Sequence, residues 1–95
     1  MTPLKTVPLE VPVGRLMVTP GALDELDEHD LFDAFSRHAR GDWGEVDEED
    51  WSANDHAFLV GGRLLSAYVD RMGKRFWIIT EADRCSTTIL LPEEY

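Results

Sequence analysis

The spacing of apolar residues divides the chain into a helical part and a strand-rich part. Between residues 20 and 60, apolar side chains recur at helical intervals, as in Leu31 and Phe35 or Trp51 and Phe58. After Gly61-Gly62 the period shortens to two, and β-branched, aromatic and aliphatic residues become frequent. The pattern therefore predicts helices first and strands afterwards.

Start and stop signals set the bounds of the first elements. Thr19 can cap a helix that has Pro20 at its first position, and Gly41 and Gly61-Gly62 are typical helix ends. The expected elements are a strand over 15–18, a helix over 20–28, a second helix from a cap at Asp30 to Gly41, and a third from a cap at Asp47 to Leu59.

The second half predicts three strands, over residues 63–70, 75–80 and 87–91. Met72-Gly73 and residues 81–84 can form the turns of an antiparallel meander, with the middle strand central because both its faces are apolar. We expect an α+β fold in which N-terminal helices pack on a three- to four-stranded antiparallel sheet. Pro3, Pro8 and Pro12 favour an extended arm over residues 1–13, followed by a single domain over 14–95.

Length and composition are those of one small globular domain, with 95 residues of which 43% are hydrophobic. No apolar run reaches the roughly 18 residues of a membrane helix, and the N-terminus lacks the core of a signal peptide. The single cysteine, Cys85, fits a reducing compartment. We expect a cytoplasmic protein that does not bind membranes.

Charge is the most unequal property of the sequence. Residues 24–55 hold thirteen of the nineteen carboxylates against two arginines, a formal charge of −11, whereas the other residues together carry +1. Such a surface repels nucleic acid and attracts basic surfaces, including those that bind phosphates. Carboxylates three or four residues apart on a helix lie roughly 5–6 Å from each other, close to the phosphate spacing of a nucleic-acid strand.

These considerations predict a partner-binding surface rather than a catalytic site. The alternative is a solvated acidic face that serves helix capping and solubility alone. The hypothesis requires one continuous, uncompensated region. Trp43, set in a turn, must either pack back on the core or contact a partner, and in the second case it would be an anchor. The predicted partner-binding residues are Asp24, Glu28, Asp42, Trp43, Glu45, Asp47, Glu48, Glu49 and Asp50.

Motifs for chemistry are mostly missing from the sequence. It contains no Gly-rich phosphate loop and no close metal-ligand spacing of histidine and cysteine, so we expect no cofactor and no metal. His38 with Asp42 is the best acid–base pair, yet a histidine near a helix C-terminus has a simpler structural explanation. We therefore expect a protein that is not an enzyme.

Four segments resemble a family of small uncharacterised proteins from bacteria, plasmids and phages. They are Gly41-Asp42-Trp43-Gly44, LLSAY at 64–68, WIITEADR at 77–84 and TTILLPEEY at 87–95, and the resemblance covers roughly residues 14–95. It implies a mobile-element setting, where small acidic proteins often inhibit host defence. In size and charge the chain is similar to phage anti-CRISPR and anti-restriction proteins that act as DNA mimics.

The leading hypothesis is a non-enzymatic inhibitor whose acidic surface occupies the basic nucleic-acid site of a defence complex, such as a type I CRISPR surveillance complex. It would bind a protein or ribonucleoprotein and no nucleic acid directly. One alternative is a ribonuclease-type toxin, with Arg71, Arg75 and Arg84 near RNA phosphates. Another is a housekeeping protein-interaction module whose binding persists at high salt.

Overall fold

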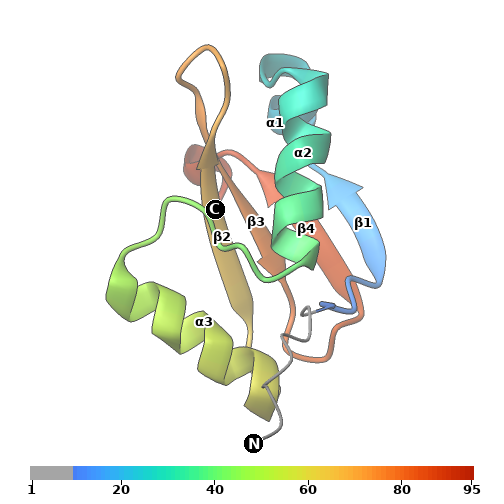
Figure 1. The fold of residues 1–95 in the computed structure, drawn as a ribbon. Helices are drawn as coiled ribbons and strands as arrows, with labels where there is room; N and C mark the ends of the chain where they lie inside the picture. Colours follow the sequence, from blue (N-terminus) through green and yellow to red (C-terminus); the bar gives the residue numbers. More distant parts are fainter. Residues whose placement is uncertain (1–9) are drawn as a thin grey trace, which may run out of the picture.

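The computed structural model describes residues 10–95 and shows an α+β fold with three α-helices and a four-stranded sheet (Figure 1). The elements in chain order are β1 (Arg15–Val18), α1 (Pro20–Glu25), α2 (Glu28–Ala39), α3 (Glu48–Val60), β2 (Leu64–Val69), β3 (Arg75–Thr80), β4 (Ser86–Leu90) and the 3₁₀ turn η1 (Pro92–Glu94). The predicted change from helices to strands after Gly61 is confirmed.

The sheet has the order β1-β4-β3-β2 and is mixed. The antiparallel meander of β2, β3 and β4 is confirmed, with β3 in an interior position. The expectation of a wholly antiparallel sheet is wrong, because β1 pairs with β4 in parallel, in the register Arg15 with Ser86 and Val18 with Ile89. Hydrophobic periodicity sets which residues face the core but not the direction of a neighbouring strand, and the helices between β1 and β2 permit a parallel neighbour.

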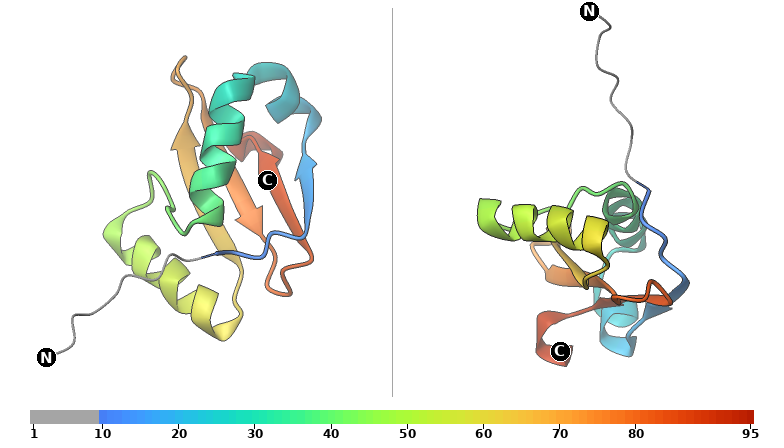
Figure 2. Two further views of the ribbon diagram at one scale, coloured as in Figure 1. Left: turned by 45° about the vertical axis from the view of Figure 1, so that its right-hand side comes forward. Right: turned by 90° about the horizontal axis from the view of Figure 1, so that it is seen from below.

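Helix α2 lies across one face of the sheet, α1 lies at the end of β1, and α3 lies beside β2 (Figure 2). Leu31 and Ala34 of α2 form one core cluster with Phe76, Ile78 and Ile89 of the sheet. A second cluster lies under α3 and contains Val11, Trp43 and Leu64, with Trp51 and Phe58 packed against them. The two clusters hold α2 and α3 on separate parts of the sheet.

Two helix bounds differ from those predicted. The first helix ends at Glu25 because Leu26 is extended, with φ −93° and ψ 147°. Asp27, and not Asp30, then caps α2 by accepting a hydrogen bond from the Asp30 N–H, so the predicted cap at Asp30 is wrong. Asp27 and Asp30 are three residues apart, and either carboxylate could cap a helix. Because the extended backbone at Leu26 ends α1, the next helix begins directly after Asp27. The predicted caps at Thr19 and Asp47 are confirmed.

The N-terminal segment joins the core before the first strand. Within residues 10–13, which form no helix or strand, Val11 is buried and its N–H donates to the Ala39 carbonyl at 2.8 Å. The rest of the predicted arm, residues 1–9, lies outside the described part. None of the helices in residues 10–95 combines the length and apolar character that a bilayer crossing needs.

Candidate partner-binding surface

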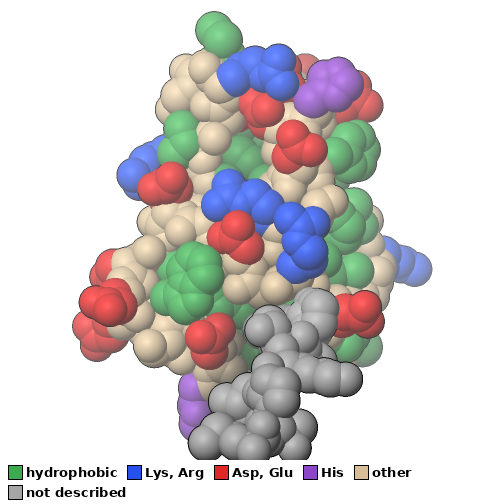
Figure 3. Space-filling model, in the orientation of Figure 1, with side chains coloured by type: hydrophobic (Ala, Val, Ile, Leu, Met, Phe, Trp, Pro, Cys, Tyr) green, Lys and Arg blue, Asp and Glu red, His purple; other side chains and the backbone are tan. Residues whose placement is uncertain are grey.

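Eleven of the thirteen carboxylates of residues 24–55 fall into two clusters, and Asp42 and Asp55 lie outside both. The one continuous, uncompensated region that the hypothesis required is therefore not present (Figure 3). The helix-junction cluster, at α1 and the first half of α2, comprises Asp24, Glu25, Asp27, Glu28, Asp30 and Asp33. The α3 acidic cluster, just before α3 and in its first turn, comprises Glu45, Asp47, Glu48, Glu49 and Asp50. Arg37 and Arg40, near the end of α2, come between them along the chain, and basic side chains separate acidic ones on the face in view (Figure 3).

Basic residues of the β2–β3 hairpin neutralise part of the helix-junction cluster. The Arg71 guanidinium lies 3.0 Å from Asp30 and 3.3 Å from Asp27, and Lys74 Nζ lies 3.0 Å from Glu25. The hydrogen bonds from Arg71 lower the pKa of Asp30 below its usual value. These contacts tie the hairpin to the start of α2. Asp24 and Glu28, predicted to bind a partner, form no ion pair within residues 10–95.

The Asp42 carboxylate is hydrogen-bonded to other groups of the protein. It accepts hydrogen bonds from the Arg37 guanidinium at 2.8 and 3.2 Å and from the Gly44 N–H at 3.1 Å. The Arg37 side chain holds the pKa of Asp42 below its usual value. Asp42 thus orders the chain between α2 and α3, and a partner would have to displace Arg37 to bind it.

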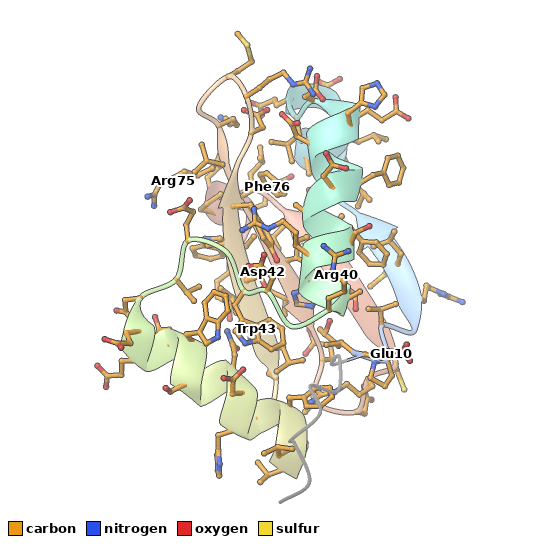
Figure 4. The ribbon with its side chains drawn as sticks, in the orientation of Figure 1. Glu10, Arg40, Asp42, Trp43, Arg75 and Phe76 are labelled. Carbon is orange, nitrogen blue, oxygen red and sulfur yellow. The ribbon has the colours of Figure 1, made fainter. Side chains whose placement is uncertain are left out.

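Trp43 cannot be the predicted surface anchor, because it has no exposed surface. It lies on the segment between α2 and α3 (Figure 4), where its indole packs edge-on to His38 and its Nε1–H donates to Asp55 at 2.9 Å. From the sequence, a large ring in this turn could either pack back or contact a partner. The structure shows the first arrangement, because the turn packs back on the core and buries the ring.

The α3 acidic cluster is exposed and rigidly placed. All five of its carboxylates lie at exposed positions, and Asp47 caps α3 by accepting from the Asp50 N–H at 2.8 Å. The preceding loop is bound to β2, because the Glu45 N–H donates to the Ala67 carbonyl and the Ala67 N–H donates to the Trp43 carbonyl. No Lys or Arg of residues 10–95 forms an ion pair with this cluster.

His38 is fully buried and belongs to a chain of polar side chains that the sequence did not predict. The Thr87 hydroxyl donates to the Val13 carbonyl at 2.8 Å, so Thr80 must donate its single proton to Thr87 at 2.7 Å. Thr80 then accepts from Nε2–H of His38 at 2.7 Å, which leaves Nδ1 to accept from Ser66 at 2.6 Å. The hydrogen bonds therefore assign the Nε2–H tautomer.

This arrangement excludes the acid–base pair of His38 with Asp42. Both ring nitrogens of His38 are occupied, Asp42 is bound to Arg37, and the imidazole has no surface at which a substrate could meet it. Burial, reinforced by the positive charge of Arg84, lowers the pKa of His38 to about 4. The ring is therefore neutral at neutral pH and acts as a link between α2, β2 and β3.

The arginines of the toxin alternative are not gathered at one place. Arg71 and Arg75 lie at the β2–β3 hairpin, whereas Arg84 lies in the β3–β4 turn at the opposite end of β3, about 20 Å away for a strand of this length. Arg71 is bound to Asp30, and Arg84 donates to the carbonyls of Gly62 and Ala57. Residues 10–95 contain no group of three or more histidine, cysteine or carboxylate side chains placed to hold a metal ion.

Comparison with known proteins finds no match to a family model, a curated protein or a solved structure. The resemblance of the four sequence segments to a family of mobile-element proteins therefore stays a prediction.

Proposed function

We propose that this protein is a non-enzymatic binding protein whose α3 acidic cluster docks on a basic surface that otherwise binds DNA or RNA. The observation that carries the proposal is the exposure of Glu45, Asp47, Glu48, Glu49 and Asp50 on one rigid segment, without an ion pair in residues 10–95. The partner we propose is the nucleic-acid site of a host defence complex, for which a type I CRISPR surveillance complex is the test case.

The position of the cluster supports a role as a phosphate substitute. Carboxylates at a helix N-terminus are stabilised by the helix dipole, so α3 can present several of them together without a neutralising partner. Asn54 fixes α3 to the sheet by hydrogen bonds to the N–H and carbonyl of Leu65, at 3.1 and 2.9 Å. A pre-ordered acidic edge loses little conformational entropy when it binds a basic surface.

The same geometry favours α3 over the helix-junction cluster as the binding surface. Arg71 and Lys74 reduce the negative potential at the helix junction, and Asp42 is bound to Arg37. The non-enzymatic assignment is supported by the enclosed state of His38, the best acid–base candidate of the sequence.

The test is displacement of labelled target DNA from a purified type I CRISPR surveillance complex by the full chain. The triple change Glu48→Lys, Glu49→Lys and Asp50→Lys leaves the Asp47 cap in place. It should weaken displacement by at least roughly a hundredfold, because the loss of three attractive pairs of about 1 kcal/mol each already costs about 3 kcal/mol. Raising NaCl from about 50 to about 200 mM should weaken direct binding of the wild-type protein to the DNA-free complex by at least about tenfold.

The matched control reverses three carboxylates of the other cluster, Asp24→Lys, Glu28→Lys and Asp33→Lys. It changes the net charge equally and breaks no ion pair of residues 10–95. An equal loss in both triple variants would contradict the assignment to α3. Failure of the wild-type protein to displace DNA at low salt would refute the decoy, and salt-resistant binding would favour an apolar interaction module.

A further inference from the structure

The two edges of the sheet differ in whether their outward backbone N–H and carbonyl groups have hydrogen-bond partners. At β2, the outer N–H and carbonyl of Leu65 bind the Asn54 side chain, and those of Ala67 bind the backbone of Glu45 and Trp43. The segment before α3 thus acts as a short additional strand, with an isolated parallel bridge between Gly44 and Ala67. Over Leu65 and Ala67 this edge is closed against further pairing.

Within residues 10–95 the edge at β1 is open. The Arg15 N–H donates to the carbonyl of Cys85, just before β4, and the N–H of Thr19, just after β1, donates to the Ile89 carbonyl of β4. In the parallel ladder every second residue of β1 therefore faces β4. The N–H and carbonyl groups of the alternate residues, Leu16 and Val18, point outward and have no backbone partner within residues 10–95. The ribbon shows no other described element outside β1 (Figures 1 and 2).

An apolar groove lies next to this open edge. Val18, Leu23, Leu26, Leu31 and Phe32 line it together with Glu28, and its volume is about 200 Å³. Leu23 and Phe32 are 71% and 52% exposed and line the same groove, so they form a contiguous apolar patch. Free backbone groups beside a side-chain pocket are the two requirements for binding an extended peptide by strand addition.

We propose that β1 and this groove bind an extended segment of another protein, one that carries apolar residues flanked by lysine or arginine. Its backbone would pair with Leu16 and Val18, an apolar side chain would fill the groove, and a basic side chain would meet Glu28. Charge complementarity selects this occupant over a second copy of the chain, because Glu28 lines the groove and two copies would each bring a net charge of −10.

This surface is independent of the α3 acidic cluster. β1 and β2 are the opposite edges of the sheet, and α3 lies beside β2 (Figure 1). The protein would therefore engage partners at two separate places, with a salt-sensitive contact at α3 and a contact based on backbone pairing at β1.

The experiment titrates the isotope-labelled full chain with a capped peptide in which lysine alternates with valine and leucine. The amide signals of Leu16 and Val18 should shift and become protected from hydrogen exchange, together with those of the groove. The change Leu16→Pro removes an outward N–H and no bond to β4, and proline is tolerated at such edge positions. It should weaken peptide binding by roughly tenfold.

A second pair of variants keeps the test decisive if Leu16→Pro perturbs the fold. Phe32→Ser opens the groove without changing charge or backbone and should weaken binding, whereas Met72→Ser, at the 84% exposed tip of the hairpin, should not. The triple lysine variant of α3 should retain peptide binding at β1. Shifts confined to α3, full binding by Phe32→Ser, absence of binding, or self-association through β1 would each overturn the proposal.

Discussion

At the scale of single residues, His38 shows how a buried polar group can hold several elements in one arrangement. Its ring joins Ser66 of β2 to Thr80 of β3, and Thr80 continues through Thr87 of β4 to the Val13 carbonyl. Within residues 10–95 no buried side-chain nitrogen or oxygen lacks a hydrogen-bond partner. A fully satisfied network of this kind specifies one packing, because any other would leave a polar group buried without a partner.

The neutral state of His38 makes the stability of the protein depend on pH. The pKa is about 4 in the folded protein and near 6.5 when unfolded, so between these values only the unfolded chain takes up the proton. The free energy of unfolding should therefore decrease as pH falls from 6.5 towards 4, by up to about 3 kcal/mol, and this contribution should be constant above 6.5. Urea denaturation at intervals between pH 7 and 4.5 measures it.

The control for this prediction is a comparison among the three histidines. His38→Gln removes the titrating group and should flatten the pH dependence in that range, whereas His29→Gln and His56→Gln change exposed side chains and should leave it intact. An unchanged slope in His38→Gln would show that another group causes the dependence.

At the scale of elements, the loop between α2 and α3 decides where the acidic cluster lies. Gly44 has φ +73° and lies against β2, so closely that an added Cβ would collide with the Ala67 carbonyl and the Tyr68 ring. The Tyr68 hydroxyl donates to the Asp42 carbonyl at 2.6 Å and fixes the same loop. Trp43 is thereby pressed into the core, and α3 begins at a fixed point beside the sheet.

Gly44→Ala should destabilise the protein by about 2–4 kcal/mol, because the new methyl group adds a steric collision to the strain of a positive φ. Gly61→Ala is the matched control, since Gly61 also has a positive φ, +89°, but nothing lies within 4 Å of its added Cβ. It should cost about 1 kcal/mol from backbone strain alone. Chemical denaturation of both variants checks the difference, and equal losses would mean that the contact with β2 is unimportant.

At the scale of the whole molecule, charge is only partly compensated within the fold. Arg37, Arg71 and Lys74 bind carboxylates near α2 and at the hairpin, yet the chain carries a formal net charge of −10. Mutual repulsion of these charges destabilises the compact state, while the ion pairs oppose it weakly because they are exposed. The balance between the two effects can be measured through its dependence on salt.

Raising NaCl from about 10 to about 150 mM shortens the Debye length from about 30 to about 8 Å and should raise the melting temperature. Salt weakens the repulsion among all the carboxylates, whereas it weakens the attraction in only a few ion pairs. The decrease in repulsion should therefore exceed the decrease in attraction. Glu48→Gln with Glu49→Gln reduces the repulsion at α3 and should give a smaller rise. A melting temperature that falls with salt would show that the ion pairs of Arg71 and Lys74 dominate.

The sequence by itself determined those features that depend on neighbouring residues. Caps at Thr19 and Asp47, the stop at Gly61, the turn at Met72-Gly73 and the meander of three strands follow from local backbone chemistry and side-chain period. The excess of carboxylates in residues 24–55 is likewise a property of composition, and it predicted an exposed acidic surface at the start of α3.

Only the tertiary structure decided which distant groups meet. The parallel pairing of β1 with β4, the burial of Trp43 and the neutralisation of Asp42 and Asp30 depend on contacts between separate elements, which no local pattern encodes. The same contacts divided most of these carboxylates into two clusters, closed the β2 edge at Leu65 and Ala67, and left the β1 edge unpaired within residues 10–95. Charge composition and hydrophobic periodicity are properties of neighbouring residues in the sequence. Neutralisation of charges, burial of side chains and unpaired strand edges depend on which distant residues the fold places next to each other.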